Sequence, residues 1–293
     1  MKHAVLGVGA IGGLVATALG SLDEEVVLIV RPEKLADYPA ALSLERPSGT
    51  LTALAKAVSR VTQPVDVLWI ATKTYQLQAA LEAVQSAPSA VVPLLNGVDH
   101  IAMLRARYGQ NHVIPATIAV EAERLAPGRF LQRSPFVRLN LASSAEPLLG
   151  AIVTRLSGFG FTCQFVQNEK TLLWSKLCFL APFALVTSAS GKNKGEIYTD
   201  PGWKAKLDSA VVEACGVARR VQGFFSPLAE SGIRIPVAIA SSMECYSGAY
   251  THILPSRPPA SLRFSPASSV ATAFRRRGFR SGRNFFRDAS SLF

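Results

Sequence analysis

Three glycines near the amino terminus carry the clearest chemical pattern in the chain. Gly7, Gly9 and Gly12 are spaced as G-x-G-x-x-G, between an apolar segment typical of a buried strand and one typical of a helix. The first glycine permits a tight turn, the second lets a ligand approach the backbone, and the third lets helix and strand pack closely. A helix that starts here offers free N–H groups, so the spacing predicts a pyrophosphate-binding turn that includes Ala10 and Ile11. A glycine-rich turn without a ligand is the alternative.

The end of the next apolar strand selects between two dinucleotide cofactors. Sites for NAD usually place an aspartate or glutamate there, which binds the ribose 2′-hydroxyl. This chain has Arg31 instead, and a guanidinium can pair with a 2′-phosphate through two hydrogen bonds. We therefore expect NADPH/NADP rather than NAD. A solvated loop arginine is the alternative.

The elements that must position these residues follow from the apolar pattern. Short β-branched segments alternate with helical ones in the first half, which is typical of a parallel sheet with crossover helices. We expect strands at 3–8, 25–30, 65–71 and 90–95, helices at 11–20 and 75–86, and a sheet extension at 113–141. In the second half the pattern predicts helices at 170–190, 203–222 and 227–243.

This pattern predicts an α/β fold class with three parts. An N-terminal NADP-binding Rossmann domain at 1–168 precedes an all-helical part at 169–243. Residues 244–293 are interpreted as an irregular basic tail, because residues 245–293 hold eight arginines, one acid and no helical period. The tail supplies most of the formal net charge of +11. The rest of the chain has a nearly ordinary charge, so we expect no nucleic-acid partner.

Composition excludes several other classes of protein. Hydrophobic residues make up 49% of the chain, which allows a sizeable core and excludes a wholly disordered protein. The four cysteines and four histidines are scattered, so neither a disulfide framework nor a metal site is expected. The stretch 4–20 has the apolarity of a signal peptide, but its five glycines favour a strand–turn–helix. We expect a cytoplasmic protein with no membrane partner.

Several motifs together resemble the ketopantoate reductase (2-dehydropantoate 2-reductase) family, over residues 1 to about 243. In chain order they are the glycine turn at 7–12, Arg31, Thr72-Lys73-Thr74, Asn96-Gly97, Ala126-Pro127-Gly128, Trp174-Ser175-Lys176-Leu177 and Ser241-Ser242-Met243. Each motif is common by itself, whereas their order and spacing are specific. The resemblance implies a Rossmann domain and reduction of 2-dehydropantoate by NADPH. It also implies that residues 169–243 form a helical substrate and catalytic domain, like that of 6-phosphogluconate dehydrogenase but incomplete at its C-terminal end.

The resemblance also implies roles for individual residues. Arg31 and Lys73 would hold the 2′-phosphate and adenosine end, and Asn96 would touch the cofactor near the ribose or nicotinamide. Lys176 would be the catalytic residue and would bind substrate together with Asn96 and Ser242. Hydride addition builds negative charge on a ketone oxygen, which a positioned ammonium stabilises before it donates a proton. Partial burial would lower the pKa of Lys176 toward neutrality. A lysine that snorkels to the helix surface is the alternative.

Two departures from the family's pattern bear on activity. Pantoate-specific members usually have asparagines one and two turns after the catalytic lysine, where this chain has Leu180 and Ala184. A site without those hydrogen-bonding groups favours a less polar ketone. The family's pattern also stops near residue 244, and we interpret this as a shift of reading frame. Codons for residues 270–277 can be chosen so that the same bases, read from two bases later, encode Arg-His-Gly-Val-Pro-Thr-Pro. That sequence resembles the family's ending. A natural, divergent tail is the alternative.

Three functions compete on these observations. The first is an NADPH-dependent reductase of a small-molecule 2-keto acid, of the ketopantoate type, working as a monomer or homodimer. The second is an NADP-binding protein with impaired catalysis, because an incomplete helical domain leaves the substrate cleft without a wall. The third is a nucleic-acid binder that uses the arginine tail. It is disfavoured because no aromatic–basic pattern lies on a recognisable element.

Overall fold

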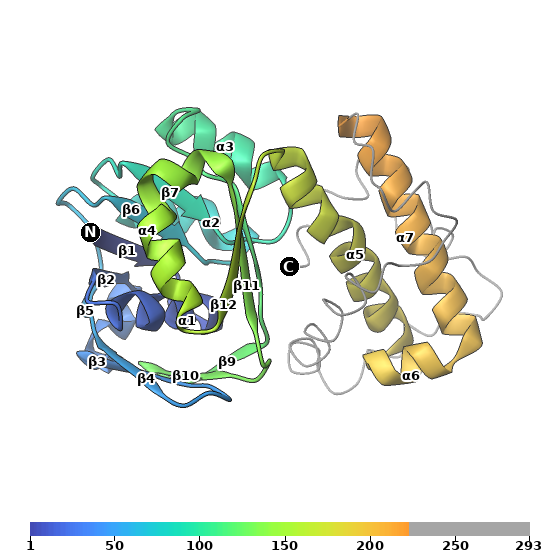
Figure 1. Cartoon of the computed structure of the whole chain (residues 1–293), viewed down its shortest axis with the longest axis horizontal. Helices are drawn as coiled ribbons and strands as arrows, with labels where there is room; N and C mark the ends of the chain where they lie inside the picture. Colours follow the sequence, from blue (N-terminus) through green and yellow to red (C-terminus); the bar gives the residue numbers. More distant parts are fainter. Residues whose placement is uncertain (223–293) are drawn as a thin grey trace. The chain divides into compact units, whose positions relative to one another are not determined.

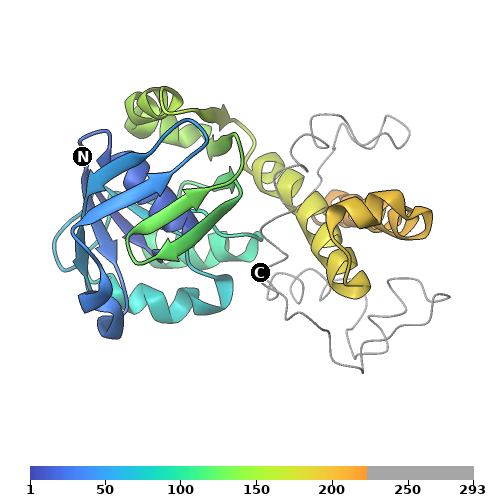
Figure 2. The same cartoon turned by 90° about the horizontal axis from the view of Figure 1, so that it is seen from below.

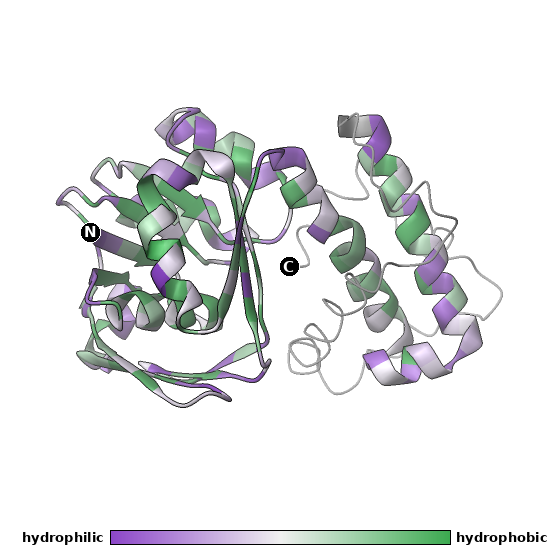
Figure 3. Cartoon of the chain, viewed as in Figure 1, coloured by the Kyte–Doolittle hydropathy of each residue, from purple (hydrophilic) through white to green (hydrophobic). Residues whose placement is uncertain are grey.

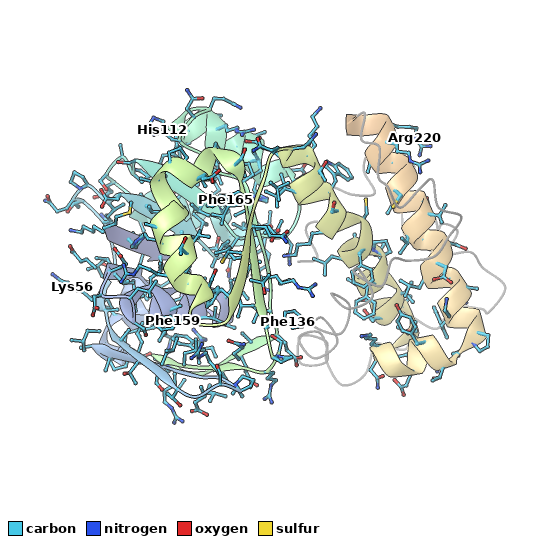
Figure 4. All side chains as sticks on the ribbon, in the orientation of Figure 1. Lys56, His112, Phe136, Phe159, Phe165 and Arg220 are labelled. Carbon is cyan, nitrogen blue, oxygen red and sulfur yellow. The ribbon has the colours of Figure 1, made fainter. Side chains whose placement is uncertain are left out.

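The chain forms two compact units in a computed structural model that describes residues 1–222. The first unit comprises Met1–Leu172, and the second begins at Leu173 (Figure 1). Figure 4 shows the described side chains, with Arg220 labelled near the end of the last described helix. The helix predicted at 227–243, including Ser242, and the tail at 244–293 lie outside the described residues.

A parallel five-stranded sheet forms the centre of the first unit, with the order β5-β2-β1-β6-β7. Its strands are β1 (Lys2–Leu6), β2 (Glu25–Ile29), β5 (Lys56–Val58), β6 (Val67–Ile70) and β7 (Ala90–Pro93). The apolar residues of these strands run without alternation because both faces of the sheet are covered. The four strands predicted from β-branched runs are therefore confirmed.

The connections of this sheet follow the doubly wound pattern. Helix α1 (Ala10–Gly20) joins β1 to β2, and η2 (Thr74–Gln76), α2 (Leu77–Ala80) and η3 (Leu81–Ala83) join β6 to β7. The two crossovers run in opposite directions along the sheet, so right-handed connections place them on opposite faces.

The helix predicted at 75–86 is shorter and broken. The backbone at Val84 is extended, and this residue forms a parallel bridge with Val61. The N–H of Val61 donates to Ala83 O, and that of Gln85 donates to Val61 O, both at 2.9 Å. Pairing with a segment outside the helix therefore ends it, although Leu77 and Leu81 keep the predicted buried face.

Two further sheets replace the single extension predicted at 113–141. The first has the order β4-β3-β10-β9, and the second the order β12-β11-β8. Their strands are β3 (Ala41–Glu45), β4 (Leu51–Leu54), β8 (Ala116–Ala119), β9 (Ala122–Ala126), β10 (Arg129–Gln132), β11 (Val137–Ala142) and β12 (Phe161–Val166). The four-stranded sheet lies across α1, as Figure 2 shows from below. Helix α1 is thus enclosed between two sheets.

The remaining elements complete the first unit around one core. They are η1 (Pro32–Asp37), α3 (Asp99–Tyr108), η4 (Ser143–Ala145) and α4 (Glu146–Ser157). Leu14 of α1, Trp69 of β6 and Phe130 of β10 belong to the same buried cluster, at 0%, 1% and 0% exposure. The apolar residues of the central strands and helices are green in Figure 3.

The described part of the second unit is helical. It contains most of α5 (Glu169–Ser190), then α6 (Lys194–Thr199) and α7 (Pro201–Gln222). Phe179 and Phe183 stack at 5.5 Å between ring centroids, in a buried cluster with Leu207 of α7. Helix α5 is long and apolar enough to cross a membrane, but 72% of its apolar window is buried, as in a core helix. A Rossmann domain followed by helices confirms the predicted fold class.

Candidate active site

Four loops that carry predicted site residues meet at one edge of the central sheet. They follow β1, β2, β6 and β7, and their strands are parallel, so all four lie at the carboxyl edge. The strand order reverses between β1 and β6, which is where open α/β sheets bind their ligands. The structure thus brings together the turn at 7–12, Arg31, Lys73 and Asn96.

Gly7 closes the turn after β1 against the loop after β6. Its backbone has φ +92°, in the left-handed region that favours glycine. A Cβ at this position would come within 2.8 Å of Thr72 Cγ2 and of the Thr72 backbone nitrogen. The first glycine is therefore required both by its own backbone conformation and by the neighbouring loop.

Gly9 and Gly12 shape the start of α1. Gly9 is the N-cap, and a Cβ there would meet nothing within 4 Å. A Cβ on Gly12 would come within 2.1 Å of Gly7 O, so only glycine allows the helix to approach the turn this closely. The first helical residues, Ala10 and Ile11, have N–H groups without intrahelical partners, and no acid lies in this first turn. The open space beside a bare helix N-terminus fits a pyrophosphate.

Arg31 follows β2 as the N-cap of η1. Its side chain is 75% exposed, and Arg31 Nε lies 3.3 Å from Glu33 Oε1. An exposed ion pair of this kind is weak, so the guanidinium can exchange its partner for a phosphate. The end of β2 presents a cation that suits a 2′-phosphate.

The loops after β6 and β7 are joined to each other. Lys73 is exposed as the N-cap of η2, and the next residue, Thr74, donates its hydroxyl to Asn96 O at 3.4 Å. Asn96 is partly buried, and Gly97 beside it has φ +97°. Lys73 and Asn96 therefore stand on neighbouring loops, as a shared ligand would need.

Lys176 belongs to the second unit, in α5. Its side chain is partly buried, and burial lowers the pKa of its amine from 10.5 to about 8. Leu180 and Ala184 follow on the same face of the helix at spacings of four residues, and both are buried. A lysine with this pKa, close to apolar side chains, can act as a proton donor near neutral pH.

Two contacts near these residues were not predicted. The Tyr38 hydroxyl donates to Val8 O inside the glycine turn at 2.9 Å. In the second unit the side chains of Cys178 on α5 and Cys215 on α7 are hydrogen-bonded to each other. This contact lowers the pKa of Cys215, while the contact and burial raise the pKa of Cys178. Both contacts join residues far apart in the chain, so no local pattern could have identified them.

The described residues offer no group of three His, Cys, Asp or Glu side chains that could hold a metal ion. The cysteines among them are Cys163, Cys178 and Cys215, and all three are free thiols.

Comparison with known proteins identifies the first unit. Residues 3–145 match the family model for ketopantoate reductase PanE/ApbA. A 2-dehydropantoate 2-reductase of Caulobacter vibrioides is 29% identical over 229 residues, which cover 75% of this chain and 74% of that protein. The uncharacterized oxidoreductase YkpB of Bacillus subtilis is 23% identical over 228 residues, which cover 75% of each chain.

Solved structures of other proteins share this fold. D-mandelate dehydrogenase, solved with NADH and anilino(oxo)acetate, aligns with a TM-score of 0.72 at 18% identity, over 100% of this chain and 97% of that one. The 2-dehydropantoate 2-reductase of Geobacter metallireducens aligns with a TM-score of 0.71 at 16% identity, over 100% and 98% of the two chains. The match over residues 3–145 places this part of the chain in the ketopantoate reductase PanE/ApbA family, and the similar proteins include oxidoreductases acting on keto or hydroxyl groups.

Proposed function

We propose that this protein reduces a 2-keto acid with NADPH, and that the acid is 2-dehydropantoate. The observation that carries the proposal is the open, glycine-lined start of α1 with Arg31 on the neighbouring strand end. The match to the ketopantoate reductase family and the 29% identical reductase of Caulobacter vibrioides support the substrate. The first unit would be the cofactor domain and the second the substrate and catalytic domain, in the cytoplasm, as a monomer or homodimer.

The residues of the first unit fit NADPH. The N–H groups at the start of α1 would bind the pyrophosphate, while Arg31 and Lys73 would bind the 2′-phosphate and adenosine end. Asn96 would contact the ribose or nicotinamide from the adjacent loop. Bound NADPH would supply the hydride.

Lys176 would polarise the ketone oxygen and protonate it. Its ammonium would stabilise the negative charge that develops there, because a fixed cation in a partly desolvated position acts strongly on a nearby oxyanion. The pKa of about 8 leaves the amine protonated at neutral pH, yet acidic enough to give up its proton. Asn96 and Ser242 would complete the substrate contacts, and Ser242 lies outside the described residues.

A second candidate function is reduction of a less polar 2-keto acid. Leu180 and Ala184 are apolar and follow Lys176 on its own helix face, so two hydrogen-bonding groups typical of pantoate-specific relatives are replaced. D-mandelate dehydrogenase, which shares the fold, was solved with the aromatic oxoacid derivative anilino(oxo)acetate. A third candidate is an NADP-binding protein with impaired catalysis, and this follows if residues 244–293 do not replace the missing part of the helical domain.

Binding and turnover separate the three candidates. NADPH and NADH are titrated against the protein by fluorescence, and 2-dehydropantoate and aryl-substituted 2-keto acids are then tested for oxidation of NADPH. Tighter binding of NADPH with turnover of 2-dehydropantoate supports the proposal, and preference for an aryl substrate supports the second candidate. Binding without turnover, rescued in a version of the chain with the family's C-terminal frame restored, supports the third. Absence of NADPH binding would overturn all three.

The Leu180→Asn/Ala184→Asn double variant tests the choice between the first two candidates. If the wild-type site prefers a less polar keto acid, restoring two hydrogen-bonding groups should shift kcat/KM toward 2-dehydropantoate by about tenfold or more. An unchanged preference would show that these two positions do not line the substrate site.

A further inference from the structure

Tyr38 connects two loops of the cofactor site that are thirty residues apart in sequence. Its hydroxyl donates to the backbone carbonyl of Val8 at 2.9 Å, in partly buried surroundings. Its ring packs against the hydrophobic core of the first unit. Val8 lies between Gly7 and Gly9, so the hydrogen bond reaches the middle of the glycine turn.

The hydrogen bond fixes the orientation of one peptide plane. The described chain contains no cis peptide bonds, so the Gly9 N–H points away from the Val8 carbonyl. Gly9 is the N-cap of α1, and its own carbonyl accepts from the Gly13 N–H at 2.9 Å. Holding the Val8–Gly9 plane therefore fixes the direction in which the turn enters the helix, on the side where Gly9 leaves open space.

Tyr38 is itself held by a rigid segment. It is the C-cap of η1, the short helix whose N-cap is Arg31 and whose first residue is Pro32. Pro39 follows, and a Cβ on Gly128 would come within 2.4 Å of Pro39 Cγ, so the segment is clamped against the β9–β10 turn. One short element thus carries the predicted 2′-phosphate ligand at its start and the contact to the glycine turn at its end.

We propose that Tyr38 is a positioning residue for the pyrophosphate-binding turn, and that it links this turn to the segment carrying Arg31. The inference rests on the proposed function, because it assumes that the turn binds a dinucleotide. The hydroxyl does not touch the ligand; it keeps the N–H groups of the turn in the orientation that binding needs. Loss of one such hydrogen bond leaves the turn in several orientations and weakens pyrophosphate binding by about fivefold.

The test is the Tyr38→Phe variant, which keeps the ring and its packing. Dissociation constants are measured for three probes: NADPH, ADP, which has a pyrophosphate but no 2′-phosphate, and adenosine 2′-monophosphate, which has the 2′-phosphate alone. We expect NADPH and ADP to bind about fivefold more weakly, with binding of adenosine 2′-monophosphate unchanged. Amide hydrogen exchange at Gly9 should become faster, and kcat at saturating NADPH should stay the same.

A matched control and two opposing outcomes complete the test. Tyr108→Phe removes a hydroxyl from α3 in the same unit and should leave all three dissociation constants unchanged. Unchanged binding of ADP and NADPH in Tyr38→Phe would overturn the positioning role. Equal weakening of all three probes would also overturn it, because a general loss of structure would then be the cause. If the wild-type protein binds neither ADP nor NADPH, the proposed function fails, and that result is separate from the comparison of variants.

Discussion

The backbone of Gly13 lies directly against the ring of Phe130. A Cβ at position 13 would come within 2.0 Å of Phe130 Cε1. Gly13 is in the first turn of α1, and Phe130 is fully buried on β10, in the sheet that covers this helix. The glycine that follows the G-x-G-x-x-G motif is therefore required by packing between helix and sheet.

The Gly13→Ala variant should be less stable than the wild type. Overpacking a core costs about 1–3 kcal/mol, and this cost outweighs the gain of about 0.5–1 kcal/mol from replacing glycine inside a helix, because the Cβ overlaps the ring so closely. Urea unfolding of the variant measures the difference. Phe130→Leu combined with Gly13→Ala should recover part of the loss, because the smaller side chain makes room for the methyl group.

Gly150→Ala is the matched control for this substitution. Gly150 lies within α4, and a Cβ there would meet nothing within 4 Å. The free energy of unfolding of this variant should rise by about 0.5–1 kcal/mol, since only the helix propensity of the residue changes. A Gly13→Ala variant that is as stable as Gly150→Ala would contradict the close contact with Phe130.

Replacing Arg31 should remove the preference for NADPH. The Arg31→Ala variant loses a charge-assisted contact with the 2′-phosphate, which corresponds to about a tenfold to hundredfold weaker binding of NADPH. NADH has no 2′-phosphate, so its dissociation constant should change by less than about twofold. Isothermal titration of both cofactors gives the ratio.

Lys34→Ala controls for the loss of a positive charge in the same segment. Lys34 lies in η1, and its ammonium pairs with Asp37 at 3.0 Å. The Lys34→Ala variant should keep the wild-type ratio of the dissociation constants for NADPH and NADH. Equal effects of the two substitutions would mean that Arg31 acts only through general electrostatics.

Replacing Lys176 should greatly lower turnover without weakening the binding of the cofactor. The Lys176→Ala variant lacks the proposed proton donor, and kcat should fall by about 10²-fold or more. The dissociation constant for NADPH, measured by fluorescence titration, should stay within about twofold, because the pyrophosphate and 2′-phosphate contacts belong to the first unit. Lys170→Ala, at an exposed position in the first turn of the same helix, should keep full activity. A large kcat in Lys176→Ala would remove this residue from the mechanism.

The pKa of Lys176 predicts the pH dependence of the reaction. Burial lowers it to about 8, so the ammonium form is complete below about pH 7 and is lost as the pH rises through 8. The kcat for keto acid reduction should therefore be level at low pH and fall about tenfold per pH unit above 8. Lys176→Arg keeps its charge in this range and should lose the descending limb of the profile.

The lowered pKa of Lys176 also makes the free energy of unfolding depend on pH. Its folded pKa of about 8 lies below the ordinary value of 10.5, so the unfolded chain binds more protons between these two pH values. The free energy of unfolding should rise with pH in this interval relative to Lys176→Met, as denaturant titrations at several pH values can show. A pH-independent difference between the two proteins would contradict the lowered pKa.

Local sequence determined the glycine turn, the strands of the central sheet and the change to helices in the second half. These features depend on spacing and on uninterrupted β-branched runs, and both are readable within a few residues. The paired strands β3 and β4 also have a local signal in the sequence, the alternation of Leu42 and Leu44 before a Pro-Ser-Gly turn.

Only the tertiary structure decided which distant residues meet. The helix after β6 ends where a bridge from Val61 begins. Residue 13 must be glycine because the ring of Phe130 lies against it, and the hydroxyl of Tyr38 fixes the orientation of the glycine turn. Periodicity records which face of an element is buried, but it does not record the partner, because that partner is chosen by packing among segments far apart in the chain.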